Sequence, residues 1–116
     1  MHGVIDGDCT DRVANRLSAI SKSRAIALAV SINSHGGSVV QSDIISKKMR
    51  DFASQKNLKI YTFAKDIAAS SGYFILSCGD EVYADRTSIV GSIGVILYKY
   101  RLQGLLEMTS AEVKQL

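Results

Sequence analysis

Two adjacent serines, Ser70 and Ser71, stand out in the stretch AKDIAASSGYFILSCGDEVYAD, residues 64–85. They lie between two alanines and a Gly-Tyr pair, where an extended segment is expected to turn into a helix. A serine at this place has two possible roles. Its hydroxyl can cap a free backbone N–H, which contributes about 1 kcal/mol. Alternatively it can be a nucleophile, with free N–H groups of the helix end holding the oxyanion that develops on the attacked carbonyl. Because one cap needs only one hydroxyl, capping does not account for both serines, and a nucleophilic role remains possible for one of them.

A glycine pair in SHGGS, residues 34–38, follows another apolar segment. Paired glycines let the backbone approach a ligand closely and aim N–H groups at it. The turn could therefore give an oxyanion donor from Gly36 or Gly37, together with the N–H that follows the serine. It could also cradle a phosphate or be a plain tight turn. Neither G-x-x-x-x-G-K-[ST] nor G-x-G-x-x-G is present to support phosphate.

A serine nucleophile needs a base, for which histidine and lysine are the usual candidates. His35 in the glycine turn and Lys65 ahead of the serines are conceivable, but solvent-exposed positions explain both equally well. The sequence contains neither an S-x-x-K dyad nor a G-x-S-x-G elbow. Local spacing therefore does not identify the base.

The elements that must position these residues alternate between helices and strands. Helical spacing predicts one helix after the capping candidates Asp8 and Thr10 and a second over residues 40–52. The apolar run AIALAVSIN, residues 25–33, is typical of a parallel strand covered on both faces. Further along, residues 58–64 predict a strand, 69–77 a helix, 81–85 a short strand and 88–96 an extended segment, and LQGLLEM predicts a last helix. This alternation indicates an α/β domain with a largely parallel sheet, in which both loops lie beyond the carboxyl ends of strands.

The composition fits one globular domain. The 116 residues are 47% hydrophobic and 22% charged, with a net charge of +3, which argues against disorder. Short basic clusters separated by apolar positions favour solvated helix faces over a nucleic-acid surface. Two cysteines and two histidines provide neither a disulfide framework nor the spacing of a metal site, and no apolar run reaches the length of a membrane span. We expect neither a metal nor another cofactor.

Three blocks of the sequence resemble the S49 peptidases, the family of signal peptide peptidase A and the SohB-like proteases. They are SINSHGGSV (31–39), DIAASSGYFILSCGDEVYAD (66–85) and SIVGSIGVI (88–96). The family typically shows I-N-S-P-G-G-S, A-A-S-G-G-Y-Y and G-S-I-G-V in this order. The resemblance implies a ClpP/crotonase-like α/β fold and a serine endopeptidase of the Ser-Lys dyad type, acting on signal-peptide-like or other membrane-associated peptides. In this chain His35 replaces the proline, and Ser71 replaces the first glycine after the nucleophile.

The resemblance also assigns roles. Ser70 corresponds to the nucleophile, the N–H groups of Ser71 and Gly37 to the oxyanion hole, and Ser92 to a serine that orients the lysine base. The expected substrate-binding residues are Gly36, Ser38, Val39, Gly91 and Gly94, where extended backbone near Gly37–Val39 and Gly91–Gly94 would pair with a peptide.

The lysine base follows the nucleophile by roughly fifty positions in the family, past Leu116. We therefore expect residues 1–116 to be a single, truncated catalytic domain that is inactive alone. The resemblance further implies a homo-oligomer and, for the full-length protein, a membrane anchor with an extracytoplasmic catalytic domain. The sequence itself does not indicate a compartment. Nucleic acid is not an expected partner.

Two other functions remain open. A crotonase-like acyl-CoA enzyme would use the same two oxyanion donors without a nucleophile. A non-catalytic relative would bind peptides or serve assembly.

Overall fold

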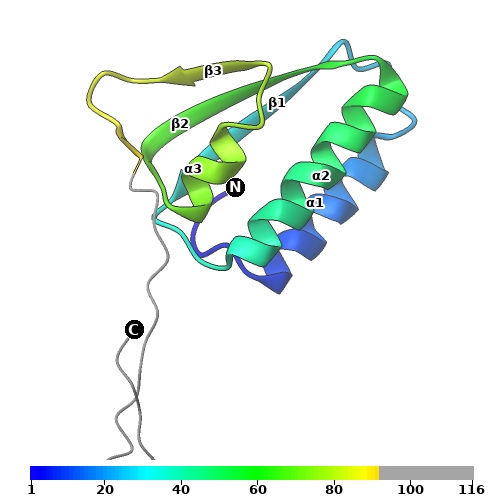
Figure 1. Ribbon diagram of the computed structural model, residues 1–116. Coiled ribbons are helices and arrows are strands. Elements are labelled where there is room, and N and C mark those ends of the chain that lie inside the picture. Colours follow the sequence, from blue (N-terminus) through cyan, green and yellow to red (C-terminus); the bar gives the residue numbers. More distant parts are fainter. Residues whose placement is uncertain (92–116) are drawn as a thin grey trace, which may run out of the picture.

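The computed structural model describes residues 1–91 and shows an open sheet with helices on one face (Figure 1). In chain order the elements are α1 (Gly7–Ile20), β1 (Ala27–Ser34), α2 (Val39–Lys56), β2 (Lys59–Ala69), α3 (Ser71–Leu76), β3 (Glu81–Ala84) and β4 (Ile89–Gly91). Strand β2 is central, with β1 on one side and β3 and β4 on the other, and every pairing is parallel. The predicted α/β class with a largely parallel sheet is confirmed.

The two long helices begin where short polar side chains cap them. Helix α1 starts after Asp6, whose carboxylate accepts the N–H of Cys9 at 2.8 Å. The prediction of a cap at Asp8 or Thr10 is wrong, because both lie inside the helix. Helix α2 starts after Ser38, whose hydroxyl accepts the N–H of Gln41 at 3.2 Å. Each such cap contributes about 1 kcal/mol.

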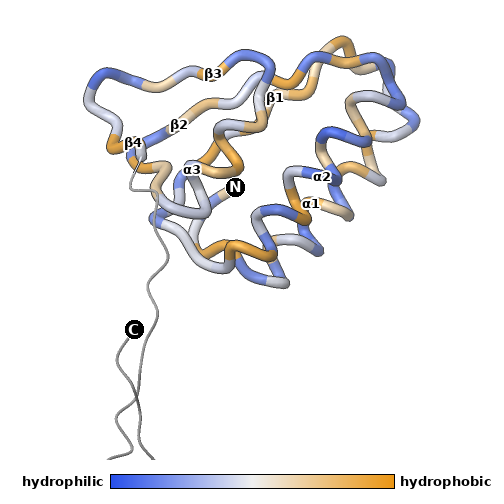
Figure 2. The backbone as a smooth tube through the Cα atoms, viewed as in Figure 1, coloured by the Kyte–Doolittle hydropathy of each residue, from blue (hydrophilic) through white to orange (hydrophobic). Residues whose placement is uncertain are grey.

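The core lies between the sheet and the helices. On β1 only alternate residues, from Leu28 to Ser34, are buried, and Ala29 between them is exposed. The prediction that this strand is covered on both faces is not met in residues 1–91, because their helices pack on one face. Figure 2 shows hydrophilic and hydrophobic stretches alternating along α1 and α2, as expected for helices with one buried side. The largest fully buried side chains include Ile5, Ile32, Ile45, Met49, Ile60, Ile75 and Leu76.

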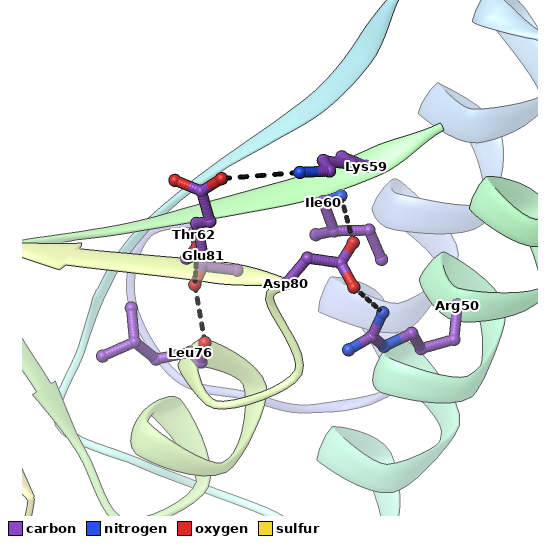
Figure 3. A network of polar contacts seen from close by, with 7 residues as sticks. All are labelled: Arg50, Lys59, Ile60, Thr62, Leu76, Asp80 and Glu81. Carbon is purple, nitrogen blue, oxygen red and sulfur yellow. Dashed lines mark hydrogen bonds and ion pairs between the residues drawn. The ribbon is translucent and has the colours of Figure 1, made fainter. Parts of the chain in front are cut away.

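Polar contacts hold the turn between α3 and β3 against the rest of the fold (Figure 3). The Asp80 carboxylate accepts the N–H of Ile60 and the guanidinium of Arg50, each at 2.7 Å. The Ile60 N–H and then Arg50 lower the pKa of Asp80 below its ordinary value. Below them, the Thr62 hydroxyl donates to the Leu76 carbonyl at 2.6 Å. These bonds fix the position of α3, and with it the corner that precedes α3.

The end of β2 differs from the boundary that the sequence predicts. Strand β2 continues to Ala69 rather than ending at Ala64, so the strand leads directly into Ser70. Helix α3 is correspondingly short. The predicted helix at LQGLLEM and most of the 88–96 segment lie outside the described residues. Within residues 1–91, no helix combines the length and hydropathy needed to cross a membrane.

Candidate active site

Ser70 forms the corner between β2 and α3, and its backbone is strained. Its φ of +52° and ψ of −120° place a non-glycine residue at positive φ, and its hydroxyl caps no helix N–H. Such a conformation costs of order 1–3 kcal/mol and is concentrated at functional sites. The nucleophile elbow of α/β-hydrolases is also a sharp, strained strand-to-helix turn. The geometry therefore favours the nucleophile over the cap, even though the G-x-S-x-G pattern is absent.

The glycine turn after β1 lies directly against this corner. A Cβ added to Gly36 would lie 3.1 Å from the Ser70 Cβ and 3.4 Å from its Oγ. On the helix side, a Cβ on Gly72 would lie 2.8 Å from the Ser34 carbonyl oxygen. Two glycines, Gly36 in the turn after β1 and Gly72 in the first turn of α3, thus allow an approach that side chains would prevent. The two turns that the sequence placed at one edge of the sheet do meet.

The N-terminal segment fixes the orientation of Gly37. The Ile5 N–H donates to the Gly36 carbonyl at 3.0 Å, and the Ser38 N–H donates to the Ile5 carbonyl at 2.7 Å. These bonds form a parallel bridge on one side of Gly37. Because the N–H and C=O of one extended residue point to the same side, both groups of Gly37 face away from Ile5.

Helix α3 lies on that other side. The Ser71 hydroxyl, whose residue is 2% exposed, donates to the Gly37 carbonyl at 3.0 Å. Within residues 1–91 no acceptor takes the Gly37 N–H, whereas the Gly36 N–H already donates to the Ser34 hydroxyl at 3.2 Å. Of the two glycines, Gly37 therefore has the N–H available to a ligand.

The backbone N–H of Ser71 is the second available donor. Ser71 is the first residue of α3, and the first N–H groups of a helix have no intrahelical acceptor. Among the described residues none accepts this N–H either. The site thus combines one uncapped hydroxyl with two free N–H groups on neighbouring turns. This combination can hold a carbonyl oxygen while a hydroxyl attacks the carbon.

The third block of the sequence also reaches Ser70. The Gly91 carbonyl accepts the Ser70 N–H at 2.9 Å, and Gly91 pairs with Ala69 at the end of β4. Gly91 is therefore adjacent to the candidate nucleophile. Ser92 and Gly94 lie outside the described residues, and their roles stay predictions.

Only part of the predicted extended segment 37–39 is extended. Ser38, the cap of α2, keeps an extended backbone, whereas Val39 is the first residue of the helix. The Ser38 N–H is already bonded to Ile5. A peptide could pair only with Gly37, and a substrate contact by the exposed side chain of Val39 stays a prediction.

Asn33 is a positioning residue that the sequence reasoning missed. The register between β1 and β2 shifts after Ile32, and the Asn33 side chain fills the gap: it accepts the Ile67 N–H and donates to Asp66, both at 3.2 Å. These bonds fix the end of β2, just ahead of Ser70. An asparagine ending an apolar strand, just before the glycine turn, was the available signal.

Neither candidate base from the sequence contacts the nucleophile. Within residues 1–91 no histidine or lysine is hydrogen-bonded to the Ser70 hydroxyl. His35 is exposed. Lys65 instead lines a cavity of about 360 Å³ at the edge of β1, together with Arg12 and Arg16. The described residues therefore include a candidate nucleophile and candidate oxyanion donors, but no histidine or lysine that is hydrogen-bonded to that nucleophile.

The chain belongs to peptidase family S49, whose model matches residues 52–115, more than half of the sequence. Among solved structures, the ClpP1 N165D mutant from Listeria monocytogenes superposes with a TM-score of 0.64 at 19% identity, covering 76% of this chain and 50% of that one. This likeness shows that the fold is ClpP-like. The family and the fold implied by the three sequence blocks are both confirmed.

Several curated relatives align with most of this chain. Protease 4 of Haemophilus influenzae is 34% identical over 89 residues, 77% of this chain and 14% of that protein. The chloroplastic serine protease SPPA of Arabidopsis thaliana is 26% identical over 98 residues, 84% of this chain and 14% of that protein. The Na(+)/H(+) antiporter NhaA of Brucella melitensis is 45% identical over 94 residues, 81% of this chain and 13% of that protein. The chain thus spans 13–14% of the length of these relatives.

Proposed function

We propose that this chain carries the nucleophile and the oxyanion hole of a serine peptidase of the S49 type, with Ser70 as the nucleophile. The observation that carries the proposal is the strained corner at Ser70, whose hydroxyl is free of any cap and lies beside two available N–H groups. Strain of this kind persists only where the surrounding structure enforces it. Two hydrogen bonds supply that enforcement: the Ser71 hydroxyl donates to the Gly37 carbonyl, and the Ser70 N–H donates to the Gly91 carbonyl.

In the proposed reaction the Ser70 oxygen attacks the carbonyl carbon of a peptide bond. Its proton passes to a base, for which the family resemblance implies a lysine outside the described residues. The N–H groups of Gly37 and Ser71 stabilise the negative carbonyl oxygen. The C–N bond then breaks, the amine leaves with the proton, and water hydrolyses the ester on Ser70.

A lysine can take this proton only if its pKa is lowered, which requires a site shielded from water. Ala68 and Ala69, directly before the nucleophile, are buried and provide apolar surroundings on one side. Tyr73 is half-buried and Phe74 exposed, so their contribution to such a pocket depends on what covers α3. The Ser-Lys dyad, the choice of peptide substrate, a homo-oligomeric assembly and a membrane anchor remain predictions.

The test is covalent labelling by a fluorophosphonate, which reacts with activated serines. The protein is prepared with any sequence that naturally flanks residues 1–116, as wild type and as Ser70→Ala. We expect labelling of the wild type only, with the adduct on Ser70 by mass spectrometry. A matched control is Ser77→Ala, which removes an exposed hydroxyl from the end of α3 that donates to the Phe74 carbonyl at 2.8 Å; this variant should label at the wild-type rate.

Cleavage of unstructured peptides should follow the same pattern. A folded wild-type protein that neither labels nor cleaves would refute the peptidase and leave the non-catalytic, peptide-binding relative. Labelling that survives in Ser70→Ala would place the nucleophile elsewhere.

A further inference from the structure

We propose that the side-chain hydroxyl of Ser71 is a positioning group for the oxyanion hole; this inference rests on the proposed function. The backbone N–H of Ser71 is one of the two proposed donors. Its hydroxyl bonds to the carbonyl of Gly37, the residue that supplies the other donor, at 3.0 Å. One residue therefore provides one donor and holds the other in place.

The geometry shows why this bond controls the direction of the Gly37 N–H. Ile5 binds the flanking Gly36 carbonyl and Ser38 N–H, so both polar groups of Gly37 itself face α3. Ile5 therefore holds the groups that flank Gly37 but neither the N–H nor the carbonyl of Gly37 itself. The bond from the Ser71 hydroxyl fixes the Gly37 carbonyl on the side of α3. Hydrogen bonds therefore restrain the backbone on both sides of Gly37.

Glycine makes such a bond necessary. Gly36 and Gly37 have φ values of +131° and +150°, and glycine has the widest range of accessible backbone conformations. A proline at position 35, as in the family pattern, would fix one φ ahead of the pair, but this chain has the exposed His35 there. The Ser71 hydroxyl, at a position where the family pattern has glycine, supplies an alternative restraint. In this chain the two departures from the pattern therefore compensate each other.

The burial of Ser71 indicates that its hydrogen bond to the Gly37 carbonyl persists and does not compete with water. The residue is 2% exposed, so its hydroxyl cannot exchange the Gly37 carbonyl for bulk water without opening the interface. Losing the hydroxyl would leave the Gly37 carbonyl without that donor and loosen the turn. Because an oxyanion hole acts on the transition state, the loss should appear in kcat and in the labelling rate rather than in KM.

The experiment compares Ser71→Ala with Ser71→Thr in the same flanked protein, by fluorophosphonate labelling and peptide hydrolysis. Misplacement of a catalytic group by a fraction of an ångström to 1 Å can reduce rates by up to about a hundredfold, so we expect Ser71→Ala to fall about ten- to a hundredfold in kcat with KM unchanged. Ser71→Thr keeps the hydroxyl and should recover most of that rate. A matched control is Ser42→Ala, since Ser42 is fully buried and its hydroxyl donates to the Val39 carbonyl at 2.7 Å. It should lower stability as Ser71→Ala does and leave kcat near that of the wild type.

The outcomes separate this inference from the proposed function. If the wild type labels on Ser70 and Ser71→Ala labels equally fast, the positioning role is refuted while the peptidase stands. If Ser42→Ala slows labelling as much as Ser71→Ala, the effect is one of general stability and the inference also fails. If the wild type does not label at all, the proposed function fails and takes this inference with it. Should Ser71→Ala not fold, Ser71→Cys replaces it, because a thiol has a similar shape and is a weaker donor; a wild-type rate in Ser71→Cys would count against the proposal.

Discussion

Backbone strain at Ser70 predicts an unusual order of stability among variants at this position. A side chain at φ +52°, ψ −120° costs of order 1–3 kcal/mol. Alanine retains the Cβ and therefore the strain, whereas glycine removes it. Glycine also increases the freedom of the unfolded chain, which costs about 0.4–1 kcal/mol. We therefore expect Ser70→Gly to be more stable than Ser70→Ala by about 0.5–2 kcal/mol.

Equilibrium urea unfolding, followed by circular dichroism, measures this difference. In thermal unfolding, 1 kcal/mol corresponds to a Tm shift of about 3–6 °C for a chain of this size. The matched control is Ser54, an exposed residue within α2, where the backbone is helical. There the order should reverse, with Ser54→Gly less stable than Ser54→Ala by about 1 kcal/mol.

If glycine is the less stable of the two at position 70 as well, Ser70 is not strained. The observation that carries the peptidase proposal would then be lost, whatever the labelling of the protein. If the order reverses between positions 70 and 54 as expected, the fold stores free energy at the residue to which we assign the chemistry.

Two further predictions concern the surroundings of the corner. Gly37→Ala should destabilise the fold by about 2–6 kcal/mol, because the new side chain would have a φ of +150° and its Cβ would lie 2.3 Å from the Ile5 carbonyl oxygen. The control is Gly7→Ala, where nothing lies within 4 Å of the added Cβ. This variant should be neutral or stabilising in the same urea assay. Folding lowers the pKa of Asp80, so its contribution is present above the ordinary carboxyl pKa and is lost as the pH falls through the lowered value. The wild type should therefore lose more unfolding free energy than Asp80→Asn between about pH 7 and pH 3, and equal losses would contradict the role of this carboxylate.

Local patterns in the sequence were sufficient for the elements and for the family. A nearly continuous apolar run predicted β1, helical spacing predicted α2, and short apolar segments predicted β2 and β3, because each element must bury apolar side chains whatever its partners are. The motif blocks carried the family for a similar reason, since each is a strand end or turn with a fixed local conformation. The boundaries differ more: β2 runs five residues further than predicted because residues 67–69 pair with β4. Beyond the register shift, Ser34 of β1 also pairs with Ala68.

The sequence by itself determined that a serine pair and a glycine pair lie where a strand gives way to a helix, since alternating strands and helices predict a parallel sheet with such junctions at one edge. A hydrophobic pattern does not specify strand order, so the pairing of these two strands is a feature of the structure. Only the tertiary structure decided what the serines do there. The positive φ of Ser70, the use of Ile5 to orient Gly37, and the hydroxyl of Ser71 on the Gly37 carbonyl all depend on segments more than thirty residues apart coming into contact. Such contacts leave no periodic trace in a chain, because each depends on single groups at isolated positions and not on a repeating pattern of side chains.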